Sequence, residues 1–589
     1  MVSTLTWVLV GLAAYTLLAM GLKSTGRLPD YIKFSGPITT IHTQRGKQVL
    51  TRLARPKRFW RAWGNLGVGI GLVIMAGSFI LVAFSAYQAV VNPQPSALNE
   101  PRNALAIPGV NDFLPLSVAP EIVFGLVLGL IVHEGGHGLF CRVEDIGIKS
   151  MGLALIAILP VGAFVEPDED ELLRSDRGVQ TRMYAAGVTN NFALSFIALL
   201  LLFGPVAGSI AVVDGAPVGD SLPGSAANAS GIDSGDVITG VDGQSVGDAR
   251  ELRSVLAAND NRNVSVSRKD GTTVTVQRAP MVVGAVQSSP LGVGTTITAV
   301  NDTAVYTRQA LERAARNNTV ATVRTEAGAN VTLPLGAYGR VDEGSPLAEA
   351  GAPVGESIIV TSLGGERTHN ATALGEALRG TSGGDTVTVV GYVDGQRQSY
   401  EVELATREDV NGGVLTSQFR IGISGFSVND FGIDSYPAAT FLEFMGGNAD
   451  ESTGVGDRSF VQRLFIVLAL PVIGVAGGFG YNFAGFTGIA TEFYTVQGPL
   501  AALGEPAIFT LANVLFWTGW INLVIGQFNL IPTFPLDGGH LLRATTESVV
   551  SRLPVPDRRS LTTAVTLAVT ASMILGLLVM VFGPRFFAG

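Results

Sequence analysis

Ile131-Val132-His133-Glu134-Gly135-Gly136-His137 lies within an apolar run, Pro120–Phe140, that is long enough to cross a lipid bilayer. Residues four apart share one face of a helix, so both histidines can point toward the same metal ion. Glu134 stands beside them, within reach of a water on that metal. Zinc lowers the pKa of such a water to about 7, and a carboxylate can then remove its proton. The segment predicts a zinc hydrolase site with His133 and His137 as ligands and Glu134 as general base.

A catalytic zinc normally keeps three protein ligands and one open position, so a third ligand is needed. The best candidate lies far downstream, in Asn529-Leu-Ile-Pro532-Thr-Phe-Pro535-Leu-Asp537-Gly538-Gly539-His540. Asp537 is a lone carboxylate among apolar residues, and the two prolines before it interrupt the helical ladder, so its side chain can turn inward. His540 competes as a ligand, but it follows two glycines and is expected to face the cytoplasm. Asp537 is therefore the predicted third ligand.

The composition of the 589 residues is that of a membrane protein. Mean hydropathy is +0.38, and 15% of the residues are charged, against about 25% in soluble proteins. A net charge of −9 argues against a nucleic-acid-binding protein. The single cysteine, Cys141, excludes an internal disulfide and is expected to be a buried, inert thiol. Only six of the 39 basic residues are lysine, which favours a halophilic archaeon as the source, with genomic composition bias as the alternative.

Six apolar runs are long enough to span a bilayer. They are Thr4–Leu22, Gly64–Val91, Pro120–Phe140, Met183–Val206, Ile508–Ile531 and Leu561–Phe582. A further apolar region, 464–490, is broken by Pro471 and several glycines and is too short for two crossings, so we expect a re-entrant hairpin. Between Lys23 and Arg61 there are ten basic residues and one acidic residue, so this loop is predicted to be cytoplasmic. The same topology places residues 213–457 outside the cell.

Residues 210–406 have a different character, because short Val/Ile/Thr-rich strands alternate with Gly/Asp turns. A pattern recurs at Ser225–Val246 and Ser345–Gly365, and in shorter form at Ser289–Val305. Each copy continues into a helical stretch, and the repeats resemble PDZ domains of the bacterial type, with the middle one truncated. A PDZ groove presents an open strand edge and a pocket to a peptide terminus. A generic β-rich loop domain is the alternative.

Two motifs together resemble the site-2 protease family of intramembrane zinc metalloproteases: HEGGH in one span and N-x-x-P-x-x-P-L-D-G-G in a later one. The resemblance covers roughly 119–210, the PDZ-like insert and 506–545, and the family's G-x-x-x-N element corresponds to Gly187–Asn191. It implies that zinc is bound by His133, His137 and Asp537, with Glu134 as the base. It also implies a substrate-binding group, in which the two asparagines contact the substrate backbone and steady the oxyanion: Asn191, Asn529 and Gly187.

The predicted fold is a polytopic α-helical membrane protein with about six spans, a re-entrant hairpin and an extracytoplasmic insert of PDZ-like β-rich domains. The predicted domains are a two-span anchor with a basic cytoplasmic loop (1–118), a first catalytic membrane half (119–210), PDZ-like 1 (211–280), a truncated PDZ-like unit (281–336), PDZ-like 2 (337–406), a linker (407–460), a second catalytic membrane half (461–547) and a C-terminal span (548–589).

A membrane-embedded protease must also unwind its substrate helix. Lys149–Phe164 is rich in Leu and Ile but too short and Pro/Gly-broken for a span. We expect it to dip inward as a strand or hairpin, whose open edge pairs with an unwound substrate. An ordinary interfacial loop is the alternative.

The predicted function is zinc-dependent cleavage of transmembrane segments of other proteins, with Zn²⁺ as cofactor and Glu134 activating the water. The predicted partners are transmembrane substrate proteins, the lipid bilayer and peptide termini at the PDZ-like grooves, with no nucleic acid. The predicted location is the cell membrane. Two alternatives remain open. One is a non-enzymatic PDZ-containing scaffold or sensor with a structural or empty metal site. The other is a membrane-embedded zincin that cuts soluble tails and takes a glutamate as third ligand.

Overall fold

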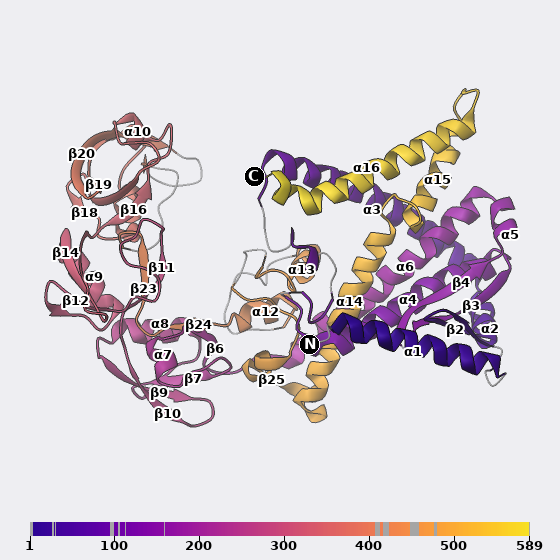
Figure 1. Cartoon of the computed structure of the whole chain (residues 1–589), viewed down its shortest axis with the longest axis horizontal. Helices are drawn as coiled ribbons and strands as arrows, with labels where there is room; N and C mark the ends of the chain where they lie inside the picture. The colour runs from indigo at the N-terminus through magenta and orange to yellow at the C-terminus, as the bar shows by residue number, and fades with distance from the viewer. Residues whose placement is uncertain are drawn as a thin grey trace. The chain divides into compact units, whose positions relative to one another are not determined.

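The protein is described here by a computed structural model (Figure 1). The structure describes residues 4–25, 29, 31–94, 99–103, 107–111, 113–157, 159–406, 413–415, 423–447, 459–475 and 480–587. The chain divides into two compact units. The helical unit comprises Met1–Ala211, Ala439–Thr491 and Thr495–Gly589, and the β-rich unit comprises Val212–Ala438 with Glu492–Tyr494.

The main helices of the helical unit are α1 (Thr4–Ser24), α2 (Gln44–Leu53), α3 (Lys57–Val91), α4 (Ala119–Val143), α5 (Glu169–Arg174), α6 (Arg177–Leu201), α12 (Ala438–Phe444), α13 (Phe460–Ala469), α14 (Glu505–Asn529), α15 (Asp537–Val550) and α16 (Arg558–Phe587). Its strands are β1 (Ile32–Ser35), β2 (Ile38–His42), β3 (Ile148–Ile156) and β4 (Leu159–Pro167). Two short strands, β5 (Ile210–Val212) and β25 (Tyr494–Val496), lie where the chain passes between the units.

The helices of the β-rich unit are α7 (Ala226–Ala229), α8 (Ala249–Ala258), α9 (Arg308–Asn317), α10 (Pro346–Glu349) and α11 (Ala371–Arg379). Its strands are β6 (Ala216–Ser221), β7 (Val237–Val241), β8 (Gln244–Ser245), β9 (Asn263–Arg268), β10 (Thr273–Gln277), β11 (Met281–Ala285), β12 (Ile297–Val300), β13 (Thr303–Ala304), β14 (Val320–Thr325), β15 (Asn330–Pro334), β16 (Ala337–Arg340), β17 (Ser357–Leu363), β18 (Glu366–Arg367), β19 (Thr386–Val393), β20 (Gln396–Glu403), β21 (Ala405–Thr406), β22 (Gly413–Val414), β23 (Phe426–Asn429) and β24 (Ile433–Ser435).

Five helical segments among the described residues are long and apolar enough to cross a membrane: Lys57–Val91, Leu116–Val143, Arg177–Ser209, Glu505–Asn529 and Arg558–Phe587. Each coincides with one of the predicted runs, and large apolar side chains such as Val73, Phe84 and Leu575 point outward and are exposed. Such surfaces are stable in lipid, so the chain is a membrane protein with a β-rich insert. The first predicted run forms α1, which is not among these five segments. A count of six spans therefore stays a prediction.

The apolar region predicted to be a re-entrant hairpin begins in α13, which ends at Ala469. Residues 476–479 lie outside the described residues. The chain that follows carries a 3-10 helix at Gly488–Phe493 before α14 begins. The hairpin topology of 464–490 therefore stays a prediction.

Helix α4 packs against both α6 and α14 (Figure 1). The closest approaches are at glycines. A Cβ on Gly136 would lie 2.8 Å from the carbonyl oxygen of Ala186 on α6, and one on Gly125 would lie 3.1 Å from the Cα of Thr518 on α14. Small residues of this kind let helix backbones approach closely in a membrane. Helix α4 is therefore held at close range by the two helices that surround the predicted site.

A four-stranded antiparallel sheet with the order β1-β2-β3-β4 packs against α2 and α4. The strand interpretation of Lys149–Phe164 is confirmed, because β3 and β4 form a hairpin across this segment. Since β4 is the last strand of the order, one of its edges carries no further strand among the described residues.

The β-rich unit contains three modules, each with its own hydrophobic core. The core residues run from Ala216 to Val276 in the first module, from Val282 to Leu335 in the second and from Ala337 to Leu404 in the third. Each core also takes apolar side chains from a later part of the chain: Phe431 in the first, Ile423 and Phe426 in the second, and Leu415 in the third.

We call residues 423–435 the return segment, because it runs back along the modules in reverse order. Its strand β23 pairs antiparallel with β11 of the second module, and β24 pairs antiparallel with β6 of the first. Between these strands, Asp430 forms an ion pair with Arg278, whose side chain is fully buried. The segment, which falls in the predicted linker, therefore adds a strand to the sheet of the first module, forms a separate two-stranded sheet with β11 of the second, and ties the two modules together.

Candidate metal centre

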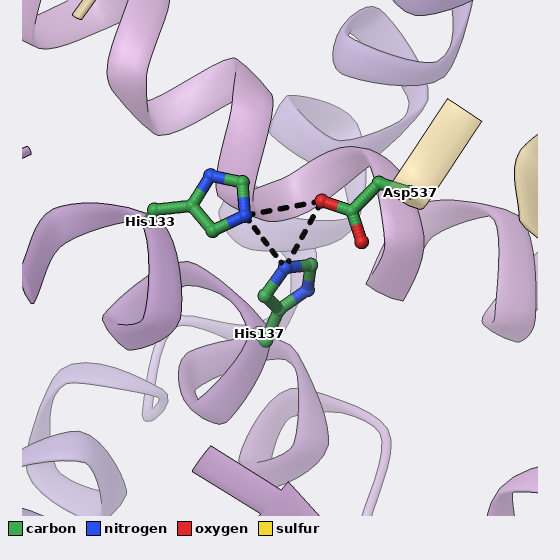
Figure 2. A group of neighbouring side chains, drawn as sticks. All are labelled: His133, His137 and Asp537. Carbon is green, nitrogen blue, oxygen red and sulfur yellow. Dashed lines mark hydrogen bonds and ion pairs between the residues drawn. The ribbon is translucent and has the colours of Figure 1, made fainter. Parts of the chain in front are cut away.

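Three side chains from distant parts of the chain converge in the helical unit (Figure 2). The Nε2 atom of His133 lies 3.1 Å from Oδ2 of Asp537, and the Nε2 atom of His137 lies 3.3 Å from the same oxygen. The two Nε2 atoms are 3.3 Å apart. All three side chains are largely buried: the exposed fraction is 7% for His133, 12% for His137 and 16% for Asp537.

The histidines come from one helix and the aspartate from the start of another. His133 and His137 lie one turn apart on α4, and Asp537 is the first residue of α15, where a carboxylate is favoured by the helix dipole. The glycines after it are required by packing, because a Cβ on Gly538 would lie 2.5 Å from the carbonyl oxygens of Leu530 and Ile531. The D-G-G order thus lets the turn after α14 fold back onto α15 and hold the carboxylate in place.

A backbone contact orients the imidazole of His137. Its Nδ1 lies 2.8 Å from the carbonyl oxygen of Met183 on α6. Because a carbonyl can only accept a hydrogen bond, Nδ1 carries the proton and Nε2 presents a lone pair. That lone pair points at the Oδ2 atom of Asp537, which is buried and has no hydrogen-bond donor.

This donor set fits a divalent cation of the zinc type. Electron pairs that converge on one point repel each other unless a cation lies between them. A tetrahedral zinc with bonds of about 2.0–2.1 Å holds its ligand atoms about 3.3 Å apart, close to the three separations found between the two histidines and Asp537. Two imidazoles and one carboxylate are also a typical ligand set for a catalytic zinc.

Glu134 is half-buried on α4 and is held by the sheet. Its Oε2 accepts a hydrogen bond of 3.0 Å from the backbone N–H of Val165 in β4. The contact is to a backbone group, and a carboxylate held in this way has a restricted rotamer. The predicted base therefore lies between the histidine-bearing helix and the edge strand.

The remaining predicted site residues divide into two groups. Gly187 and Asn191 lie on α6 against the histidines: a Cβ on Gly187 would be 2.6 Å from His137 Nε2, and the Asn191 amide is 3.4 Å from His133 Nδ1. Asn529 is the last residue of α14, where its side chain is half-buried.

The two other residues considered from the sequence lie outside the cluster. The ring of His540 stacks on Tyr184 with a centroid distance of 4.8 Å and lies edge-on to Phe534. Cys141 is fully buried in a core shared by α2, α4 and α6, and its thiol is free. The structure therefore groups Asp537, and not His540, with the two histidines.

Sequence reasoning missed two contacts of this site: the Met183 carbonyl and the Val165 N–H. Both are backbone groups, which every residue type supplies, so no residue pattern marks them. The four-residue spacing of Met183, Gly187 and Asn191 places them on one face of α6, which is the one signal that a sequence could have given.

The profile of peptidase family M50 matches residues 121–573. An uncharacterized protein of Methanocaldococcus jannaschii is 28% identical over 172 residues, 29% of this chain and 44% of that protein. A membrane-bound transcription factor site-2 protease homolog of Arabidopsis thaliana is 27% identical over 220 residues, 35% of this chain and 40% of that protein. Rip3 of Mycobacterium tuberculosis, which its name gives as a candidate zinc metalloprotease, is 41% identical over 56 residues, 10% of this chain and 14% of that protein.

The chain spans less than half the length of each of these relatives. The family profile, in contrast, covers well over half of this chain and includes both histidines of the cluster and Asp537. The chain therefore belongs to peptidase family M50, which confirms the site-2 protease family predicted from its two motifs.

Proposed function

We propose that the protein is an intramembrane zinc metalloendopeptidase that cuts transmembrane segments of other membrane proteins. The observation that carries this proposal is the convergence of His133, His137 and Asp537 within a unit of membrane-crossing helices. Membership of peptidase family M50 supports it, as do the names of the Arabidopsis and Mycobacterium relatives.

His133, His137 and Asp537 would hold the zinc ion. Zinc bound there supplies Lewis-acid activation of water and of the scissile carbonyl. Glu134 removes the proton from the attacking water and delivers it to the leaving amine, as a general base and then a general acid. Its hydrogen bond from Val165 keeps the carboxylate beside the histidine pair and next to β4.

The edge of β4 is the proposed binding surface for the substrate backbone. Val165 points its N–H away from β3 toward Glu134, and alternate residues of a strand point their backbone groups the same way. Ala163 therefore presents its N–H and C=O on that free edge. A substrate helix must unwind before its peptide bonds can be attacked, and pairing with an edge strand satisfies the backbone groups that unwinding exposes. Asn529 is proposed as a further contact to the substrate backbone.

Ala163→Pro tests this edge. Proline removes the outward N–H but leaves the β3 pairing intact, because an edge strand tolerates proline at an outward position. We expect the KM for a membrane substrate to rise several-fold and bound zinc to stay unchanged. Steady-state cleavage by detergent-solubilised protein gives the first quantity and metal analysis the second. An unchanged KM would mean that the edge of β4 does not bind the substrate backbone.

The β-rich unit is proposed to be extracytoplasmic and to consist of PDZ-like modules. In the first module the return segment already pairs with the edge strand β6, and in the second it pairs with β11. Arg367 of the third module donates hydrogen bonds to the carbonyls of Ala315 and Asn318 at the end of α9 in the second. These contacts favour a rigid size filter over capture of peptide termini at the first two modules.

The proposed function is tested in liposomes with two reporters. One carries a single transmembrane segment with short tails, and the other carries the same tails without the segment. We expect a cut within the segment, no cut in the free tails, loss of cutting after chelation and recovery with added zinc. Cleavage of the tails alone would favour a zincin that acts on soluble segments. Bound zinc without cleavage of either reporter would favour the scaffold.

A further inference from the structure

One face of α6 contacts both histidines of the metal centre. Met183, Gly187 and Asn191 are spaced by four residues and therefore share this face. The Met183 carbonyl accepts from His137 Nδ1, Gly187 leaves the space in front of the two Nε2 atoms free, and the Asn191 amide lies 3.4 Å from His133 Nδ1. In each of the two histidines, α6 therefore contacts Nδ1, the ring nitrogen that faces away from Asp537.

The amide of Asn191 is fully buried, and its orientation determines which nitrogen of His133 is free. If Nδ2 donated to Nδ1, the neutral imidazole would carry its proton on Nε2, which could then bind no metal. It would also leave the buried Oδ1 of Asn191 without a partner. The amide occupies the same space after a half-turn. In that orientation Oδ1 of Asn191 accepts a hydrogen bond from Nδ1–H of His133. The buried oxygen then has a partner, and Nε2 of His133 keeps a lone pair for the metal.

We propose that Asn191 is a positioning residue, whose Oδ1 accepts the Nδ1–H of His133 and thereby directs the Nε2 lone pair at the zinc. This inference rests on the proposed function and replaces the substrate contact expected for Asn191 from the family resemblance. A side chain with 0% exposure that is already engaged with a ligand histidine has no surface to offer a substrate. Partners of this kind typically change metal affinity by about 10–100-fold when they are removed.

Two variants of Asn191 separate the acceptor role from a donor role. Asn191→Asp keeps the shape and can only accept, so it retains zinc affinity. Asn191→Leu can do neither, so its zinc Kd rises by about 10–100-fold. If Asn191→Leu prevents folding, Asn191→Ala replaces it, because alanine also lacks a hydrogen-bonding group and does not overfill the site. Zinc Kd is measured by competition with a chelator, and the absorption spectrum of the cobalt-substituted protein reports on the ligand geometry.

The matched control is Asn190→Leu. Asn190 is the next residue on α6, but its Oδ1 accepts a hydrogen bond of 3.0 Å from Trp63 Nε1 on α3 instead of contacting a histidine. We expect this variant to lower the melting temperature and to leave the zinc Kd and the cobalt spectrum unchanged. A parallel loss of zinc in both leucine variants would mean that any damage to α6 empties the site, which overturns the specific role.

A substrate-binding donor role gives the opposite pattern. Asn191→Asp, Asn191→Leu and Asn191→Ala would all then keep the wild-type zinc Kd and lose turnover on the membrane reporter, and the inference fails while the proposed function stands. If the wild type binds zinc and cuts nothing, but Asn191→Leu still weakens zinc, the proposed function fails and the inference stands. A wild type that binds no zinc overturns both.

Discussion

Replacing Glu134 with glutamine will lower the turnover number for the membrane reporter by about 10²–10⁴-fold, the usual contribution of a general acid–base group. Glutamine has the shape of glutamate and its amide oxygen can still accept the Val165 N–H, so the local structure is kept. The amide cannot take a proton from water. Single-turnover cleavage in liposomes measures the loss, and metal analysis should find unchanged zinc, because Glu134 is not one of the three converging side chains.

Glu169→Gln is the control for the loss of one carboxylate. Glu169 is exposed in the first turn of α5 and is not one of the three converging side chains, so this variant should keep the wild-type rate. If Glu134→Gln kept more than about a tenth of the wild-type turnover, another group would have to be the base.

Replacing Gly187 with alanine will strongly weaken zinc binding. The added methyl carbon would lie 2.6 Å from His137 Nε2 and 2.9 Å from His133 Nε2, closer than such atoms can approach. The methyl group would therefore stand where the two lone pairs meet and would force the imidazoles apart. We expect zinc content to fall by more than about tenfold and cleavage to fall with it. Metal analysis of the purified protein, together with a thermal melt, measures both binding and folding.

Gly178→Ala provides the comparison on the same helix. The nearest atom to a Cβ at Gly178 is Arg182 Nη1 at 3.5 Å, an ordinary contact, so alanine is accommodated there. Both variants gain helix propensity, by about 1 kcal/mol. If Gly187→Ala retained full zinc content, the two histidines would have to bind the ion from another side than the one facing α6.

The sequence predicts those features of the fold that depend on neighbouring residues. An apolar run such as Gly64–Val91 marks a membrane-crossing helix, because length and hydropathy alone decide whether a helix is stable in lipid. HEGGH predicts two imidazoles on one face, because helix geometry places residues four apart together. Asp537 could be joined to them through its motif, and the three side chains do converge.

Other features depend on contacts between distant segments and leave no local pattern. Residues 423–435 look like part of a linker, yet Phe426 and Phe431 fill cores built mainly from chain about ninety residues or more earlier. Gly187 and Asn191 could be recognised as a motif from the sequence. Their contacts with the histidines emerged only once α6 was packed against α4. A spacing shows which residues share a face but not what that face touches.

The return segment has a consequence for how the protein is made. The hydroxyl of Ser225 in the first module donates a hydrogen bond to the carbonyl of Gly432, which lies 207 positions later in the chain. A ribosome delivers the N-terminal part first, so the first module is translated long before the strand that finishes it. That module must wait, incomplete and with an unpaired edge, until the third has been synthesised. Truncation after residue 406 would therefore damage the earliest-made module as well as the latest.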